Sequence, residues 1–496
     1  MSREIKGRVA RGAVWMVAMR LSVTLLGFAS TVILARLLVP ADFGLVALGT
    51  ALVAALELLT SFRFEVSLIQ NQQAGREEYD TAWTLNQLLG LSLALLLCLF
   101  AWPAAAFYDD PRLAPIVFAL ALGALLDGAQ NIGIVNFRRN LEFARDFAFT
   151  VTRKVVQCVV AGLLAYEFRS YWALAAGILA ASLTGLVASY AMESYRPRWS
   201  LARARQLFDF SKWLVIDNAM YFLRHRMSTV IIGRFVGPGA VGLFMLAYEL
   251  ATLTHANLTA PIDRALFPGY SRMAGDRALV RSSYLAVAGM TALIAMPLVI
   301  GTASAAPSLV PVLFGPQWTE SISLVQLLAL GSSISLLGSG ASAVYLALGQ
   351  PRILVWLGAV QATVLLGSMT LFVREIGIEG AAWGYIAAAC VSLPLQLGIL
   401  RWAMDLSPAL WWRRIWRPVL ACAAMHLVIV QLQATAGDLH PGLAGLAQLF
   451  GFVLAGGATY VATVLFLWAM AGRPSGAEAL AIQQLRKYLG RGAVTG

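Results

Sequence analysis

The stretch ILARLLVPADFGLVAL, residues 33–48, occurs a second time in altered form as IIGRFVGPGAVGLFML, residues 231–246. The two copies align without gaps at an offset of 198 residues, and six of their sixteen positions are identical. At the same offset Trp15 falls on Trp213. Each copy reads as the end of an apolar helix, a tight turn with Arg, Pro and Gly, and the start of the next helix. The repeat predicts a chain built from two similar halves.

Composition places both halves in a membrane. Of the 496 residues, 59% are hydrophobic and 12% are charged, and the mean hydropathy is +0.73. Because a soluble domain carries about 25% charged residues, this chain has too little polar surface to cover a globule of its size. The composition excludes a soluble enzyme and a secreted disulfide scaffold. The four cysteines lie inside apolar runs without metal-ligand spacing, and we expect buried thiols and no metal site.

The apolar runs that are long enough to cross a bilayer number about fourteen. One crossing needs about 20 apolar residues, and all the connections between the runs are short. The runs are centred on residues 13–35, 43–62, 82–107, 113–135, 148–168, 171–192, 209–233, 240–262, 282–304, 321–348, 353–373, 378–400, 415–433 and 442–470. They predict an all-α integral membrane protein with about 14 transmembrane helices.

Six runs separate the two copies of the repeat, so both copies cross the membrane in the same direction. This predicts two parallel six-helix lobes around a central cavity, as in carriers that work by alternating access. The predicted parts are residues 1–200 for the N-terminal lobe, 201–405 for the C-terminal lobe, 406–472 for helices 13 and 14, and 473–496 for a cytoplasmic tail with an amphipathic helix.

The distribution of Lys and Arg sets the orientation. With a cytoplasmic N-terminus, the cytoplasmic segments hold 27 of the 37 basic residues and the opposite side holds five. This asymmetry predicts that both termini are cytoplasmic. We therefore expect the net charge of +12 to orient the chain in the membrane and to attract anionic lipids, and not to bind nucleic acid. One face of the tail, from Ala477 to Leu489, is apolar, and we expect it to lie on the membrane surface.

Several ionisable residues fall inside the predicted spans, where each costs about 2.5–3.5 kcal/mol to insert. Some of them lie at matched depths. The matched sets are Arg20 with Glu57, Asp127 with Arg153 or Lys154, and Arg226 with Glu249. One interpretation is that these are neutralised structural pairs. The other is that they line a basic cavity for an anionic substrate, since an ion pair in a cavity can open when an anion arrives.

Arg224 is the predicted cavity-facing cation of the second lobe. Arg224 and Arg226 lie two residues apart, so their side chains diverge by about 200° around a helix, and only Arg226 has a depth-matched partner. His225 and His255 are typical of packing histidines more than of proton carriers. Asp217 is a candidate for a coupling cation, although a water-filled vestibule also accounts for it.

The repeated stretches, SLIQ at 67–70 and PIDRALFPGYSRM at 261–273 resemble Wzx-type polysaccharide flippases, which belong to the multidrug/oligosaccharidyl-lipid/polysaccharide exporter superfamily. This resemblance implies two six-helix lobes around a cavity and no enzymatic activity. It implies movement of undecaprenyl-diphosphate-linked repeat units across the bacterial inner membrane for exopolysaccharide, capsule or O-antigen (lipopolysaccharide) assembly. The implied partners are the lipid-linked oligosaccharide and membrane lipids, with a polymerase and export proteins as further candidates.

On this hypothesis, arginines hold the diphosphate of the substrate because a guanidinium bonds phosphate oxygens bidentately and stays charged. Arg20 would serve the cytoplasmic side and Arg224 the midplane, with Arg153 and Lys154 as further substrate-binding cations. No cofactor or metal is expected.

Three alternatives stay open at this point. A multidrug exporter and a lipid II exporter share the predicted architecture. A membrane glycosyltransferase or polysaccharide polymerase belongs to a different class and needs a sizeable periplasmic loop with catalytic acids. The longest predicted periplasmic loop, residues 302–319, contains no acidic residue.

Overall fold

The computed structural model describes residues 3–60, 62, 64–205, 207, 222–223, 226–436, 442–474, 476–480 and 483, with the side chains of 3–11, 13, 59, 253–265 and 443 left aside. By its internal contacts the chain forms two compact units, residues 1–242 and residues 243–496. The predicted lobe boundary after residue 200 stays a prediction.

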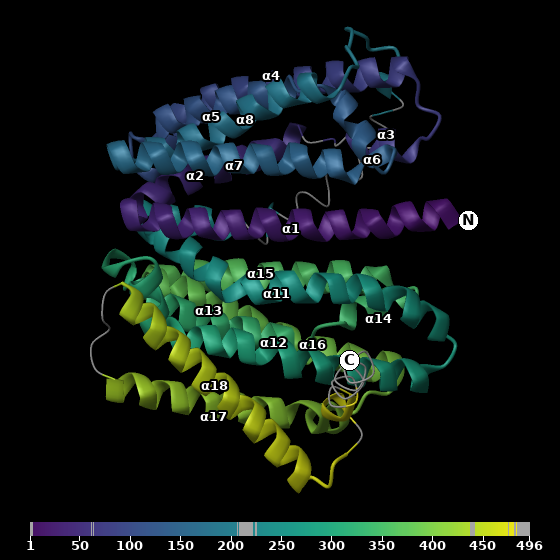
Figure 1. Ribbon diagram of the computed structural model, residues 1–496, viewed down its shortest axis with the longest axis vertical. Coiled ribbons are helices and arrows are strands. Elements are labelled where there is room, and N and C mark those ends of the chain that lie inside the picture. The colour runs from purple at the N-terminus through teal and green to yellow at the C-terminus, as the bar shows by residue number, and fades with distance from the viewer. Residues whose placement is uncertain are drawn as a thin grey trace, which may run out of the picture. The chain divides into compact units, whose positions relative to one another are not determined.

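The first unit is built from helices that pack mainly in sequential pairs (Figure 1). Its elements are α1 (Arg3–Leu37), α2 (Pro40–Thr60), α3 (Phe64–Gln70), α4 (Arg76–Tyr108), α5 (Leu113–Gly128), η1 (Ile132–Ile134), α6 (Val135–Arg139), α7 (Phe143–Phe168), α8 (Trp172–Met192), α10 (Met227–Phe235) and the first turn of α11 (Pro238–Met273). Helix α4 packs along α5, and α7 packs along α8 and α1. In lipid a helix satisfies its own backbone hydrogen bonds, which is why the apolar runs become helices.

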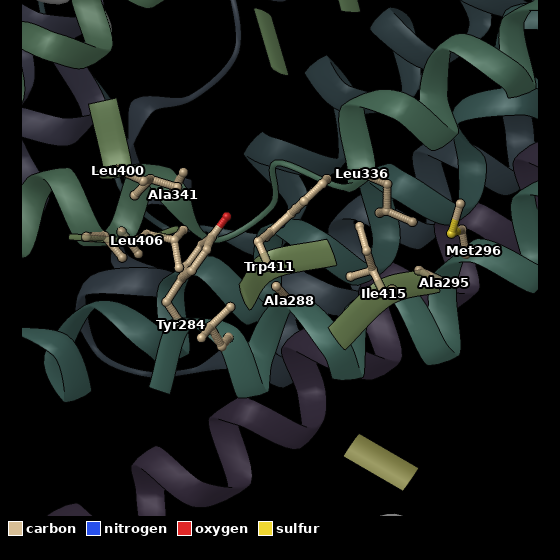
Figure 2. Packing of buried hydrophobic residues seen from close by; sticks show 14 of the residues in the cluster. Tyr284, Ala288, Ala295, Met296, Leu336, Ala341, Leu400, Leu406, Trp411 and Ile415 are labelled. Carbon is tan, nitrogen blue, oxygen red and sulfur yellow. The ribbon is translucent and has the colours of Figure 1, made fainter. Parts of the chain in front are cut away.

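The second unit contains the rest of α11 and the remaining helices. These are α12 (Arg277–Leu313), η2 (Pro316–Trp318), α13 (Ser321–Leu336), α14 (Ala341–Ala347), α15 (Pro351–Ile376), α16 (Ile378–Met404), α17 (Pro408–Ala436) and α18 (Leu443–Met470). Its largest core cluster joins α12 to α13, α14, α16 and α17, and Figure 2 shows Tyr284 and Trp411 within it. Both rings are buried, so the cluster fixes the start of α17 against α12.

The described residues contain 11 helices that are long and apolar enough to cross a membrane, or 12 if the bent pair α5–α6 counts as one span. The all-α membrane fold is therefore confirmed, while the count of 14 stays a prediction. The predicted seventh span, residues 209–233, lies largely outside the described residues. The predicted eighth span lies within α11.

The two copies of the sequence repeat meet inside the first unit, where the start of α2 crosses the start of α11. A Cβ atom added to Gly44 would overlap the carbonyl oxygen of Pro238, and one added to Gly242 would overlap the carbonyl oxygen of Pro40. The contact is reciprocal because Pro40 and Gly44 are the repeat equivalents of Pro238 and Gly242. Small residues let membrane helices approach this closely, so the Pro and Gly of the repeat have a packing role.

The first residues of the C-terminal tail pack against helices of the second unit, while the position of the rest of the tail on the membrane surface stays a prediction. Residues 477–480 are helical, and Ala477 is buried beside Gly289 of α12. Glu478 forms an ion pair with Arg417 of α17 at 3.2 Å between Oε1 and Nε, and each side chain is only 3% exposed. The start of the tail is thus part of the second unit. The ion pair compensates the charge of the buried Glu478, which an apolar-face pattern does not reveal.

The expectation that all four cysteines are buried is wrong. Cys422 is buried and Cys158 is half-buried, but Cys98 on α4 and Cys390 on α16 are exposed. All four are free thiols. Apolar runs in a membrane protein also supply its outer surface, so a thiol within such a run need not face the protein core.

We expect Gly44→Ala to destabilise the protein, because the new Cβ meets backbone atoms that cannot rotate away. Overpacking of this kind costs about 1–3 kcal/mol. Gly239→Ala is the matched control, since a Cβ at Gly239, in the same turn of α11 as Gly242, has no atom within 4 Å. Thermal unfolding of the purified full-length variants measures the difference. Equal midpoints for the two variants would contradict the close crossing.

Candidate functional site

The first unit contains two adjoining cavities, of about 420 and 630 Å³. Residues of α1, α3, α6, α7 and α8 line the smaller cavity, and residues of α2, α3, α4, α5 and α8 line the larger one. Glu65 and Arg138 line both. Charged groups gather here although the surrounding helices are apolar, which marks this region as the candidate site.

Asp127 is the centre of a polar network at the end of α5. Its Oδ1 accepts a hydrogen bond from Arg153 Nη2 of α7 at 2.9 Å, and its Oδ2 accepts one from Ser182 Oγ of α8 at 2.8 Å. Gln130 Nε2, in the bend after α5, also donates to Oδ1. The structure therefore forms the ion pair that sequence depth suggested for Asp127, and it selects Arg153 over Lys154. One carboxylate ties three helices together.

Arg153 reaches Asp127 by crossing the surface of α8 at a glycine. Its Nε donates to the carbonyl oxygen of Ala181 at 3.3 Å, and its guanidinium lies 5.6 Å from the ring centre of Phe149. A Cβ atom at Gly185 would come within 2.8 Å of the guanidinium carbon and Nε of Arg153. The absence of a side chain at Gly185 makes room for the arginine, so this residue belongs to the site although it carries no functional group.

Lys154 also lines the smaller cavity. Among the described residues its Nζ hydrogen-bonds the amide oxygen of Gln157 at 3.4 Å, and its Cε lies 3.7 Å from the Cβ position of Gly27. An amide oxygen does not neutralise an ammonium group. Lys154 is therefore the cation in this cavity that a bound anion could pair with at the lowest cost.

Sequence reasoning missed a second ion pair in the lining of these cavities. Arg138 Nε and Asp146 Oδ2 are 3.0 Å apart, and the Asp146 side chain is 10% exposed. The predicted spans leave both residues in the connection between residues 135 and 148. In the structure a short helical segment after α5 turns by 67° and brings Arg138 toward α7, and run length and depth do not give this bend.

The lining of the two cavities is mixed in charge. The carboxylates are Glu57, Glu65, Asp127 and Asp146, and the cations are Arg138, Arg153 and Lys154. These cavities hold carboxylates as well as cations, and the basic cavity for an anionic substrate stays a prediction. A site of this kind can exchange partners on its cations, whereas a strongly basic site attracts anions through excess charge.

The remaining predicted residues lie elsewhere in the fold or outside the described residues. Glu57 lines the larger cavity and Arg20 lies exposed on α1, and their pairing stays a prediction. Arg226 precedes α10 and Glu249 lies exposed on α11, and their pairing stays a prediction. Asp217, Arg224 and His225 lie outside the described residues, as does the side chain of His255.

An extended strap, residues 193–203, packs against α4 and the bend that follows α5. It runs along the first half of α4, where Tyr195 OH donates to Asp80 Oδ1 and the rings of Trp199 and Trp83 meet edge to face. Burial and the hydrogen bond to Asp80 raise the pKa of Tyr195, so its hydroxyl remains a neutral donor. The strap thereby becomes part of the first unit.

Asn131 connects this strap to the bend that carries the site. Its side chain donates to the carbonyl oxygen of Tyr195 at 2.6 Å and accepts from the amide of Gly133 at 2.9 Å. Its own amide donates to Ser189 Oγ at 2.9 Å. With no exposed surface, Asn131 fixes the position at which α5 ends and the chain turns into α6.

Comparison with known proteins agrees with this architecture. The family described as "Polysaccharide biosynthesis protein" matches residues 33–323, which is more than half of the chain. The chain belongs to this family. The match covers both copies of the repeat and the α2–α8 part of the candidate site, and it confirms the resemblance to polysaccharide flippases.

Three relatives share part of the sequence. The chain is 25% identical over 336 residues to the lipopolysaccharide biosynthesis protein WzxC of Escherichia coli (strain K12), covering 66% of this chain and 67% of that protein. It is 26% identical over 328 residues to the succinoglycan biosynthesis transport protein ExoT of Rhizobium meliloti (strain 1021), covering 66% of each. It is 22% identical over 387 residues to the teichuronic acid biosynthesis protein TuaB of Bacillus subtilis (strain 168), covering 75% and 78%.

Solved transporters share the fold. The lipid II flippase MurJ in an inward closed conformation matches with a TM-score of 0.68 at 14% identity, covering 93% of this chain and 100% of that one. An inward-facing multidrug resistance MATE transporter of the MOP superfamily matches with a TM-score of 0.57 at 14% identity, covering 78% and 96%. The family and the fold place this chain among transporters and not among enzymes.

We expect Asn131→Ala to lower the free energy of unfolding by about 1–3 kcal/mol, because it leaves the buried amide of Gly133 without its acceptor. It also removes one of two donors to the Tyr195 carbonyl, which Arg196 Nη1 contacts at 2.9 Å. Asn140→Ala is the matched control, since Asn140 is exposed nine residues further on. Thermal unfolding of both full-length variants tests this. A midpoint for Asn131→Ala equal to that of the control would mean that the bend is held by other contacts.

Proposed function

We propose that this chain moves undecaprenyl-diphosphate-linked oligosaccharide repeat units across the bacterial inner membrane for the assembly of exopolysaccharide, capsule or O-antigen. The family match carries this proposal, supported by relatives named for lipopolysaccharide, succinoglycan and teichuronic acid biosynthesis. The fold of a transporter supports transport by alternating access. Lys and Arg distribution supports cytoplasmic termini.

The physical requirement is to carry a charged, hydrated head group through a region that disfavours both properties. The lipid tail remains in the bilayer while polar side chains replace water around the sugar and the diphosphate. Arg153 and Lys154 are the proposed substrate-binding cations of the first unit, and Arg20 and Arg224 would contact the substrate before and after them. A polysaccharide polymerase and export proteins are the proposed partners downstream.

A lipid II exporter and a multidrug exporter are the rival transporters. Solved structures of both kinds share the fold of this chain, with TM-scores of 0.68 for MurJ and 0.57 for the MATE transporter. The family match and the names of the relatives favour the polysaccharide substrate over both.

We expect Lys154→Gln to lower export of the repeat unit about tenfold or more. The variant removes a charged hydrogen bond to an anion, which is worth about 1.5–3 kcal/mol, and a factor of ten corresponds to about 1.4 kcal/mol. The assay is complementation of a strain lacking the chain, in which lipid-linked repeat units should accumulate on the cytoplasmic leaflet. Export rate and membrane abundance are measured together.

Arg145→Gln is the control, since Arg145 is an exposed cation on the same helix, paired with Glu142 at 3.1 Å. It should retain wild-type export. Full export by Lys154→Gln at normal abundance would remove Lys154 from the substrate path. Absence of any lipid-linked intermediate from the deletion strain would reject the proposed function itself.

A further inference from the structure

Asp127 accepts hydrogen bonds from three donors, and only one of these donors is charged. The charged donor is Arg153, and the neutral donors are Ser182 at 2.8 Å and Gln130. The side chain of Asp127 is 48% exposed, whereas that of Arg153 is 29% exposed. The carboxylate therefore keeps two protein donors and access to water if the arginine leaves it.

This arrangement differs from an ordinary buried ion pair. Removing one partner of a buried pair is strongly destabilising because the other charge is stranded. Here Asp127 is not stranded, because Ser182 and Gln130 continue to solvate it. The contact between Arg153 and Asp127 can open at a low cost in free energy.

Arg153 also lies at the surface of the smaller cavity. It lines the cavity of about 420 Å³ together with Lys154, whose polar partner among the described residues is the amide oxygen of Gln157. An oxyanion in this cavity would meet a guanidinium and an ammonium from successive residues of α7. Guanidinium groups bond phosphate and carboxylate oxygens in the same bidentate manner.

We propose that Asp127 pairs with Arg153 in place of the substrate's anion. An incoming phosphate or carboxylate takes over Arg153, and Asp127 then keeps only its hydrogen bonds from Ser182 and Gln130. The ligand is an oxyanion of the transported molecule, either the diphosphate of the lipid carrier or the carboxylate of an acidic sugar. In this respect the inference rests on the proposed function. Exchange leaves the number of paired charges unchanged, so the substrate can be released as readily as it is bound.

Gly185 is the positioning residue of this exchange. It lets the Arg153 guanidinium lie across α8, within reach of both Asp127 and the cavity. A methyl group at this position would push the guanidinium away from α8. The three atoms nearest to a Cβ at this position belong to Arg153 and Gln130, so the effect of Gly185→Ala falls on the site.

The test is calorimetric titration of the purified full-length protein with inorganic pyrophosphate and, separately, with sodium glucuronate. Asp127→Asn keeps the shape of the side chain but releases Arg153, so it should bind the recognised anion about two- to fivefold more tightly than wild type, the range expected for an exposed or partly exposed pair. Asp127→Asn combined with Arg153→Gln should lose this gain. Gly185→Ala should bind more weakly, whereas Gly162→Ala, where a new Cβ has no atom within 4 Å, should bind as wild type does.

Tighter binding of pyrophosphate alone would identify the carrier diphosphate as the ligand, tighter binding of glucuronate alone would identify an acidic sugar, and a gain with both would show a general oxyanion site. No gain with either probe, or weaker binding by Asp127→Asn, would overturn the proposal. Should Asp127→Asn not fold, Asp127→Ser provides the same comparison. Because these readouts measure binding and not export, they are independent of the complementation assay, and their failure is distinguishable from failure of the proposed function.

Discussion

The first unit depends on one carboxylate placed where lipid surrounds the protein. Asp127 lies at the end of α5 and accepts hydrogen bonds from α7, from α8 and from the bend that follows α5. An ionised carboxylate without polar partners is unfavourable inside a membrane-spanning unit, so these three elements remain close enough to hydrogen-bond it. The shape of the cavities, the direction of Arg153 and the need for a glycine at position 185 all follow from this requirement.

A second constraint acts on the backbone. Without a hydrophobic driving force between helices in lipid, close contact relies on small residues and on shape. The two copies of the repeat satisfy this constraint in the same way. Gly44 and Gly242 each pack against the proline carbonyl of the other copy, too close for a side chain to fit between them. The second compact unit begins at Leu243, directly after this contact. The proline and the glycine that the two copies share are therefore residues that the packing requires.

Much of the architecture could be predicted from the sequence because it depends on position along the membrane normal. Run length gives the helices, and the distribution of Lys and Arg gives a predicted orientation. Depth alone paired Asp127 with a cation of α7, and the structure contains that pair. Depth does not give rotation about a helix axis or the direction of a bend. For that reason the turn of 67° that brings Arg138 to Asp146, the strap at 193–203 and the buried Glu478 could not be foreseen.

The proposed function comes down to one physical step, in which the protein carries an anionic, sugar-bearing head group from one leaflet to the other. Its most direct test is reconstitution of the full-length protein into vesicles that contain a polyprenyl-diphosphate oligosaccharide in both leaflets. A membrane-impermeant glycosidase added outside then reports the fraction of substrate that it can reach over time. The account predicts that the enzyme reaches nearly all of the substrate in vesicles with the wild-type protein and only the outer leaflet's share in vesicles without it. An equal, partial fraction in both would contradict the claim.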